Sequence, residues 1–171
     1  MQNLEIKCRV VDVHALRRLV MAAGGSRIGE LRQIDTYFRA GHGLLKLREI
    51  EGQPAELIAY ERPESSGSRI SDYQLYTTVD PAGLKEVLAR SHDLLVTVRK
   101  VRELFLIEQT RVHLDSVEGL GSFVELETAG TNRGPNEVRA EHERIMEALE
   151  LDRTRGIGLG YAAMLGASVP S

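Results

Sequence analysis

Charged side chains alternate with apolar ones along several short segments of the chain. The alternation is clearest in residues 3–10, 45–48, 110–117 and 122–128. Because successive side chains of a strand point to opposite faces, each segment has one apolar face and one charged face. The carboxylates on the charged faces are Glu5, Asp115, Glu125 and Glu127, and the cations are Lys7, Lys46, Arg48 and Arg111, with Lys100 and Arg102 supplied by residues 95–107. These ten residues are the first candidates for a chemical site.

The charged faces have two interpretations. A solvated face of an antiparallel sheet is the common reason for such alternation. The grouping of the residues by sign favours an inward face instead, because a solvated surface more often mixes acids and bases. A cavity lined by these groups is costly unless something binds them. A metal-bound polyphosphate would satisfy both signs, since carboxylates hold Mg²⁺ or Mn²⁺ and Lys and Arg hold phosphate oxygens.

Short strands and three helices must position these residues. The pattern predicts strands at residues 3–10, 34–40, 44–50, 55–62, 69–79, 95–107, 110–117 and 122–128. Helices are predicted after Asp12, at Asp80-Pro81 and after Pro135-Asn136, and Gly24-Gly25 ends the first. About eight antiparallel strands with surrounding helices predict an α+β fold, and closure into a β-barrel would remove the sheet edges.

Composition limits the class of protein. The chain has 171 residues, of which 42% are hydrophobic and 27% charged, so we expect one folded domain over residues 1–171, with a C-terminal helical segment from about 136 packed on the barrel. No apolar run is long enough to span a membrane and the start does not resemble a signal peptide, which predicts a cytoplasmic protein. A net charge of -3 and 5% aromatic residues argue against a nucleic-acid partner.

Two single residues have ordinary structural explanations. The only cysteine, Cys8, alternates with core residues and is predicted to be buried, and alone it can form neither an internal disulfide nor a structural zinc site. His113 lies between Arg111 and Asp115 on the charged face. A hydrogen-bonded structural role is favoured for this histidine over a catalytic one.

An ordered series of motifs resembles the CYTH superfamily, which includes class IV adenylate cyclases and thiamine or inorganic triphosphatases. The start, Asn3-Leu4-Glu5-Ile6-Lys7, is similar to its E-x-E-x-K signature. The later matches are Asp35-Thr36-Tyr37-Phe38, Leu45-Lys46-Leu47-Arg48, Lys100-x-Arg102, Arg111 through Asp115, Glu118-Gly119-Leu120-Gly121, Phe123, Glu125-Leu126-Glu127 and a late tyrosine, Tyr161. The resemblance covers about residues 2–165.

The resemblance implies a fold and a set of roles. It implies a closed antiparallel β tunnel that binds a triphosphate and a divalent metal, Mg²⁺ or Mn²⁺. Metal would be held by Glu5, Asp115, Glu125 and Glu127, catalytic roles would fall to Lys7, Lys100 and Arg102, and phosphate would be bound by Lys46, Arg48, Arg111 and Arg62. Members of the family often pair as dimers, so a homodimer is an expected state.

The chain departs from the family pattern in two places. Asn3 stands where the first Glu of the signature is expected, which predicts fewer metal ions or weaker metal binding. Many members carry a lysine where this chain has Glu61. The neighbouring Arg62 would lie on the opposite strand face unless a bulge redirects it.

Three functions fit this sequence. The first is hydrolysis of the terminal phosphate of ATP, thiamine triphosphate or tripolyphosphate. The second is the class IV cyclase reaction, in which the ribose 3′-hydroxyl attacks the α-phosphorus of ATP and releases pyrophosphate. The third is a non-catalytic polyphosphate or nucleotide sensor that has lost one metal ligand at Asn3. Hydrolysis is slightly favoured over cyclisation, because the residues named are suited to bind phosphates and metal, and none of them identifies an adenine pocket.

Overall fold

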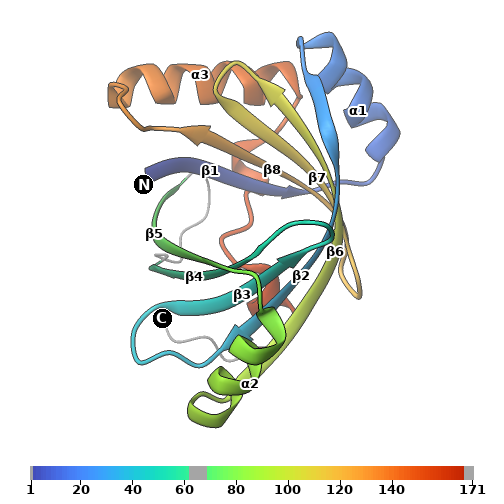
Figure 1. Ribbon diagram of the computed structural model, residues 1–171. Helices are drawn as coiled ribbons and strands as arrows, with labels where there is room; N and C mark the ends of the chain where they lie inside the picture. Colours follow the sequence, from blue (N-terminus) through green and yellow to red (C-terminus); the bar gives the residue numbers. More distant parts are fainter. Residues whose placement is uncertain (1, 62–68, 168–171) are drawn as a thin grey trace.

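The computed structural model describes residues 2–61 and 69–167. This part of the chain forms eight strands and four α-helices (Figure 1). The strands are β1 (Gln2–Arg9), β2 (Ser26–Phe38), β3 (Leu44–Ile50), β4 (Ala55–Glu61), β5 (Arg69–Thr78), β6 (Leu94–Ile107), β7 (Thr110–Val117) and β8 (Gly121–Ala129). The helices are α1 (Val13–Ala22), α2 (Pro81–Ser91), α3 (Pro135–Ala148) and α4 (Tyr161–Met164), with a short 3₁₀ turn at Arg153–Arg155.

All the strand pairs are antiparallel, which confirms the predicted α+β class. The strand order is β1-β5-β4-β3-β2-β6-β7-β8, and β8 pairs again with β1. The first strand therefore has two neighbours that lie far from it in the sequence. Among the described residues, its ladder with β8 runs from Asn3 to Arg9 and its ladder with β5 from Gln2 to Glu5.

The hydrophobic core lies on the outer face of the strands. Apolar side chains of β1, β6, β7 and β8, such as Ile6 and Leu126, pack against Leu16 and Val20 of α1 and against Ile145 of α3. Figure 1 shows α3 lying across the strands at one end and α2 beside β3 at the other. The charged faces are thereby turned inward, as the grouping by sign predicted.

The predicted helix starts have the expected caps. The Asp12 carboxylate accepts a hydrogen bond from the Ala15 N–H at 2.8 Å, and the Asp80 carboxylate accepts one from the Gly83 N–H at 2.9 Å. After α1 the chain turns through Gly24, whose φ of +85° favours glycine. The described residues contain no helix that is both long and apolar enough to cross a membrane.

Two elements differ from the prediction. β2 begins at Ser26 rather than near residue 34, and its first seven residues are mostly exposed. Exposed polar residues on both faces give no alternation, so the pattern becomes visible only where the strand starts to bury side chains, at Gln33. The four-residue helix α4 was not predicted, because one helical turn is too short to show a period.

Candidate functional site

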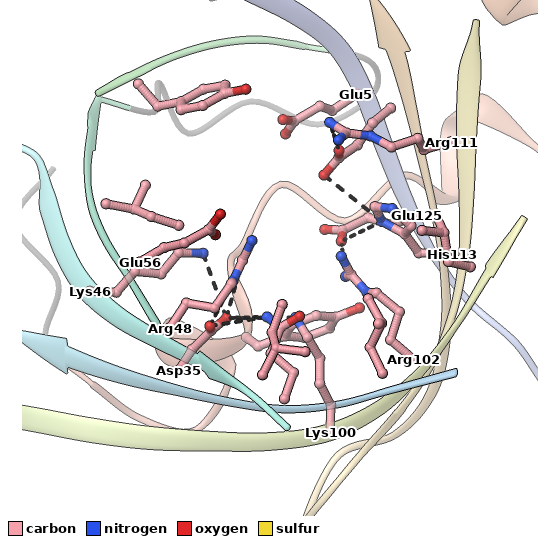
Figure 2. A pocket seen from close by; sticks show the side chains of 18 of the residues that line it. Glu5, Asp35, Lys46, Arg48, Glu56, Lys100, Arg102, Arg111, His113 and Glu125 are labelled. Atoms are coloured by element: carbon pink, nitrogen blue, oxygen red, sulfur yellow. Dashed lines mark hydrogen bonds and ion pairs between the residues drawn. The ribbon is translucent and has the colours of Figure 1, made fainter. Parts of the chain in front are cut away.

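The inward faces of the strands enclose one charged cavity of about 300 Å³ (Figure 2). Its polar lining consists of Asn3, Glu5, Lys7, Gln33, Asp35, Lys46, Arg48, Glu56, Lys100, Arg102, Arg111, His113, Glu125 and Glu127. The strand alternation that predicted the charged faces is what places these residues together, because each strand contributes side chains two positions apart.

One cluster in the cavity is centred on a buried carboxylate, Asp35 of β2. The Arg48 guanidinium donates to its Oδ1 at 3.0 Å, and the ammonium groups of Lys46 and Lys100 lie 3.6 and 3.7 Å from its Oδ2. The Gln33 amide donates to both oxygens at 3.0 and 2.9 Å. Figure 2 shows the three cations converging on this carboxylate from β3 and β6. We call these four charged residues the Asp35 cluster.

Burial and charge oppose each other within this cluster. Burial alone would raise the pKa of Asp35, but the charges of Arg48, Lys46 and Lys100 outweigh it and hold this pKa well below the ordinary value. For Lys100, burial and the nearby Arg102 charge lower the pKa of the ammonium group. The lowered pKa of Asp35 favours its carboxylate form. Three basic side chains surround this one carboxylate, and this arrangement is suited to an anion.

A second cluster is formed by Arg102, Asp115 and Glu125, whose side chains are all buried. Arg102 donates to both oxygens of Asp115 at 2.6 Å and to Glu125 Oε2 at 2.7 Å. The Tyr161 hydroxyl donates to Asp115 Oδ2 at 2.8 Å. Asp115 therefore faces Arg102 and Tyr161 and is not among the residues that line the cavity.

Lys7 links this second cluster to the C-terminal segment. Its ammonium lies 3.1 Å from Glu125 Oε1 and 3.9 Å from the centre of the Tyr161 ring. Tyr161 itself packs with Phe123 and with inward-facing residues at one end of the strands, so α4 covers the interior at this end. The chain that follows α3 thus completes the site without being part of the sheet.

Two carboxylates and an imidazole meet on the facing strands β7 and β8. His113 lies directly opposite Glu125 in the strand register, and Glu127 is two residues further on the same face. One oxygen or nitrogen from each of these three residues lies within 4.8 Å of the others. Glu5 lines the cavity from β1, where it is paired in register with Glu127.

The charges around this group also favour ionised carboxylates. Burial raises the pKa of Glu125, but Lys7, His113 and Arg102 hold it well below the ordinary value. For Glu127, the charges of His113 in its protonated form and of Arg111 outweigh burial and lower the pKa. Burial and the Arg102 charge lower the pKa of His113, which favours the neutral imidazole. Two ionised carboxylates and a neutral imidazole make a donor set suited to a divalent cation.

The cavity also has an apolar part, which the sequence did not predict. It is formed by Leu31, Ile50, Ile58, Leu75 and Leu104, with Tyr73 beside them. Leu75 is 42% exposed, so this surface is open to solvent. The arrangement offers an organic group a place to bind beside the charged residues.

The structure brings together most of the residues predicted from the sequence. The predicted residues that line the cavity are Glu5, Lys7, Lys46, Arg48, Lys100, Arg102, Arg111, Glu125 and Glu127. Arg111 is half exposed and contacts Glu127 at 2.7 Å. Arg62 lies outside the described residues. Asp35 and Gln33 were missed as site residues, although their spacing with Tyr37 on one strand face was a signal that could have shown them.

Comparison with known proteins gives related chains of similar length. A candidate adenylate cyclase from Methanocaldococcus jannaschii is 23% identical over 176 residues, covering 97% of this chain and 99% of the relative. The PH1012 protein from Pyrococcus horikoshii superposes with a TM-score of 0.84 at 22% identity, over 94% of this chain and 98% of that chain. A candidate adenylyl cyclase from Hippeastrum, described as having a dominant triphosphatase activity, gives 0.65 at 20% identity over 98% of both chains.

The structural matches show a shared fold, and the family match goes further. The CYTH domain family matches residues 1–157, which include all strands of the sheet and helix α3. This range contains every residue of both charged clusters but not Tyr161, which contacts the second one. The chain therefore belongs to the CYTH domain family.

Proposed function

We propose that this protein is a divalent-metal-dependent enzyme that binds triphosphates in its charged cavity and hydrolyses the terminal phosphate. The observation that carries the proposal is the pairing of two unlike clusters across one cavity: surplus cations around Asp35, and metal-type donors at Glu125 and Glu127. A metal-bound triphosphate has the complementary charges. Closure of the strands into a tunnel around the substrate is part of this proposal.

The Asp35 cluster would bind the phosphate chain. Arg48 can hold a phosphate through paired N–H donors, and Lys46 and Lys100 act as compact charges. Asp35 keeps these side chains within 3.0 to 3.7 Å of one carboxylate before substrate arrives. They are thus positioned in advance, so binding requires less ordering of flexible side chains.

A divalent cation fits the opposite side of the cavity. Glu125 and Glu127 are ionised, and Glu5 lines the same cavity from the neighbouring strand. Bound there, Mg²⁺ or Mn²⁺ would offset charge on phosphate oxygens and help to orient them. Asp115 would contribute by fixing Arg102, since both of its oxygens accept hydrogen bonds from that guanidinium.

Hydrolysis transfers the terminal phosphoryl group to water and leaves a diphosphate with additional charge. Lys100 of the Asp35 cluster and Arg102 of the second cluster both line the cavity and would stabilise that charge. The lowered pKa of Lys100 makes its ammonium a better proton donor to the leaving oxygen. Lys7, held by Glu125 and the Tyr161 ring, would add a fixed positive charge beside the metal ligands.

The class IV cyclase reaction is the second candidate. It is supported by the apolar part of the cavity, where Ile58, Leu75 and Tyr73 could contact a nucleotide base. The relative from Methanocaldococcus jannaschii is named as a candidate adenylate cyclase, and the Hippeastrum protein is described as having a dominant triphosphatase activity. Both reactions therefore need to be measured on the same preparation.

Chromatography of the products separates the candidates. The purified protein is incubated with ATP, tripolyphosphate or thiamine triphosphate, each with Mg²⁺ or Mn²⁺. Release of terminal phosphate from at least one substrate, faster than cyclic AMP formation from ATP, supports hydrolysis. Cyclic AMP and pyrophosphate as the main products, with tripolyphosphate intact, would support the cyclase instead. Binding without turnover of any substrate would identify a sensor.

A further inference from the structure

We propose that His113 is itself a metal ligand, through Nδ1, and that it gives this site a preference for Mn²⁺ over Mg²⁺. The inference rests on the proposed function only in placing a metal ion at Glu125 and Glu127. It adds a nitrogen donor to a site otherwise made of carboxylate oxygens.

The Nδ1 atom of His113 is buried and makes no hydrogen bond within the described residues. His113 as a whole is only 4% exposed. Buried polar atoms are nearly always paired, because an unpaired one loses its contacts with water and gains nothing in return. A buried imidazole nitrogen that faces two carboxylates without bonding either is therefore unusual.

The distances from His113 Nδ1 to the two carboxylates also favour a shared metal ion. Nδ1 lies 3.9 Å from Glu125 Oε2 and 3.9 Å from Glu127 Oε1, and hydrogen bonds are shorter, about 2.7–3.2 Å. Two atoms that bind one cation at about 2.1 Å each can lie up to roughly 4.2 Å apart. The separation of 3.9 Å is thus too long for a hydrogen bond but within the range expected for two atoms that bind the same metal ion.

Glu127 contacts Arg111 through Oε2, which leaves Oε1 as the oxygen nearest His113. Glu125 Oε2 accepts a hydrogen bond from Arg102 at 2.7 Å, and a carboxylate oxygen has a second lone pair that an ion could use. All three residues lie on facing strands in fixed register, so their positions are set by the backbone. An ion could bind without moving the sheet.

The choice of metal follows from the nitrogen. Mg²⁺ strongly prefers oxygen ligands, whereas first-row transition metals accept imidazole. A site with one imidazole and carboxylates should therefore bind Mn²⁺ more tightly than Mg²⁺. The histidine contributes to this difference, whereas the carboxylates contribute to the binding of both ions.

Direct Mn²⁺ binding tests the inference without an activity assay. Free Mn²⁺ is titrated by electron paramagnetic resonance in wild type and in His113→Gln, and Mg²⁺ is measured by competition. The same substitution at the exposed His42 is the matched control. We expect His113→Gln to weaken Mn²⁺ binding by about tenfold or more while Mg²⁺ binding changes by less than about threefold, and His42→Gln to change neither.

A spectroscopic signature makes the test independent of affinity and of folding defects. Electron spin echo measurements on Mn²⁺-loaded wild type should show coupling to a directly bound ¹⁴N nucleus, and the coupling should persist in His42→Gln. Absence of this coupling from wild type would overturn the inference, as would equal losses of Mn²⁺ and Mg²⁺ affinity in His113→Gln. If the protein shows nitrogen coupling but hydrolyses no triphosphate, the proposed function is rejected and the inference about His113 stands. If it hydrolyses a triphosphate but shows no nitrogen coupling, the inference about His113 is rejected and the proposed function stands.

Discussion

The two sides of the cavity differ in how their buried charges are paired. Around Asp35, three cations share one buried carboxylate, so the contacts leave positive charge in excess. On the opposite side, Glu125 contacts both Lys7 and Arg102, Arg102 also pairs with Asp115, and Glu127 contacts Arg111, so three carboxylates meet three cations. The difference indicates that the first side is built to receive an anion, while the second is nearly neutral and can accept a cation. A metal-bound triphosphate could bind both sides at the same time, with its phosphates on the first and its metal on the second.

The sharpest way to break the Asp35 cluster is Asp35→Asn. This change leaves the buried Lys46 and Lys100, together with Arg48, without their shared carboxylate, and removing one partner of a buried ion pair costs about 3–5 kcal/mol. We expect a loss of unfolding free energy of that size in urea titrations. The exposed Asp93, paired with Arg39, is the matched control, and Asp93→Asn should cost less than about 1 kcal/mol.

An anion should rescue the Asp35→Asn variant. Tripolyphosphate would replace the missing negative charge, so it should raise the melting temperature of the variant by more than that of wild type. Equal shifts in the two proteins would show that the cations around Asp35 are structural and do not bind phosphate.

Acid should weaken both sides of the cavity. The folded-state pKa values of Asp35 and Glu125 lie well below their ordinary values, so their stabilisation is present above the ordinary carboxylate pKa of about 4 and is lost as the pH falls through the folded values. Unfolding free energy should therefore begin to fall below about pH 5 and continue to fall as the pH drops towards the folded pKa values. The fall should be smaller in Asp35→Asn, and an identical pH profile would contradict the role of Asp35.

On the opposite side, Glu127→Gln should separate activity from stability. The partner Arg111 is half exposed, so losing this pair should cost less than about 1 kcal/mol of stability. Metal-dependent turnover should nevertheless fall by about a hundredfold or more. Glu125→Gln is the comparison, because it removes a buried carboxylate that contacts both Lys7 and Arg102 and should also lower the melting temperature. Wild-type turnover in Glu127→Gln would show that this carboxylate holds no metal.

A smaller effect is expected from Lys46→Ala. Lys46 is one of three cations around Asp35, so its loss should weaken tripolyphosphate binding by roughly tenfold, measured by calorimetry. Lys85, which pairs with Glu49 outside the cavity, gives the control Lys85→Ala, with unchanged affinity. Similar affinities for the two variants would remove Lys46 from the phosphate site.

The smallest change should come from Asn3→Glu. Asn3 lines the cavity on the same strand face as Glu5, so a carboxylate there adds a donor near the metal ligands. We expect Mn²⁺ affinity to rise by a few-fold, roughly the effect of one further charge in a partly solvated site. A titration that matches wild type would place position 3 outside the reach of the metal.

Much of this site could be predicted from strand alternation. The period of two separates Glu125 and Glu127 from their apolar neighbours, and the structure turns these charged faces inward as the grouping by sign indicated. Alternation cannot show which charges meet. The pairing of Arg102 with Asp115, which occupies both oxygens of that carboxylate, depends on strands brought together by the fold.

The missed features have the same physical cause. Asp35 lies on a strand whose first half shows no pattern, so its three cationic partners from β3 and β6 were not apparent. The role of Tyr161 depends on a one-turn helix that covers the end of the strands. His113 was interpreted as a hydrogen-bonded structural residue, whereas its Nδ1 lacks a hydrogen bond within the described residues.

The position of β1 has a consequence for folding. Its partners are residues 69–72 and 123–129, far from it in the sequence, and the Lys7 carbonyl accepts a hydrogen bond from the Ile157 N–H at 2.7 Å. Such distant pairings form slowly, and an unpaired strand edge invites aggregation. Charged side chains on the inward face of an edge strand oppose pairing with other chains. We therefore expect Glu5 and Lys7 to oppose such pairing until β5 and β8 have joined β1.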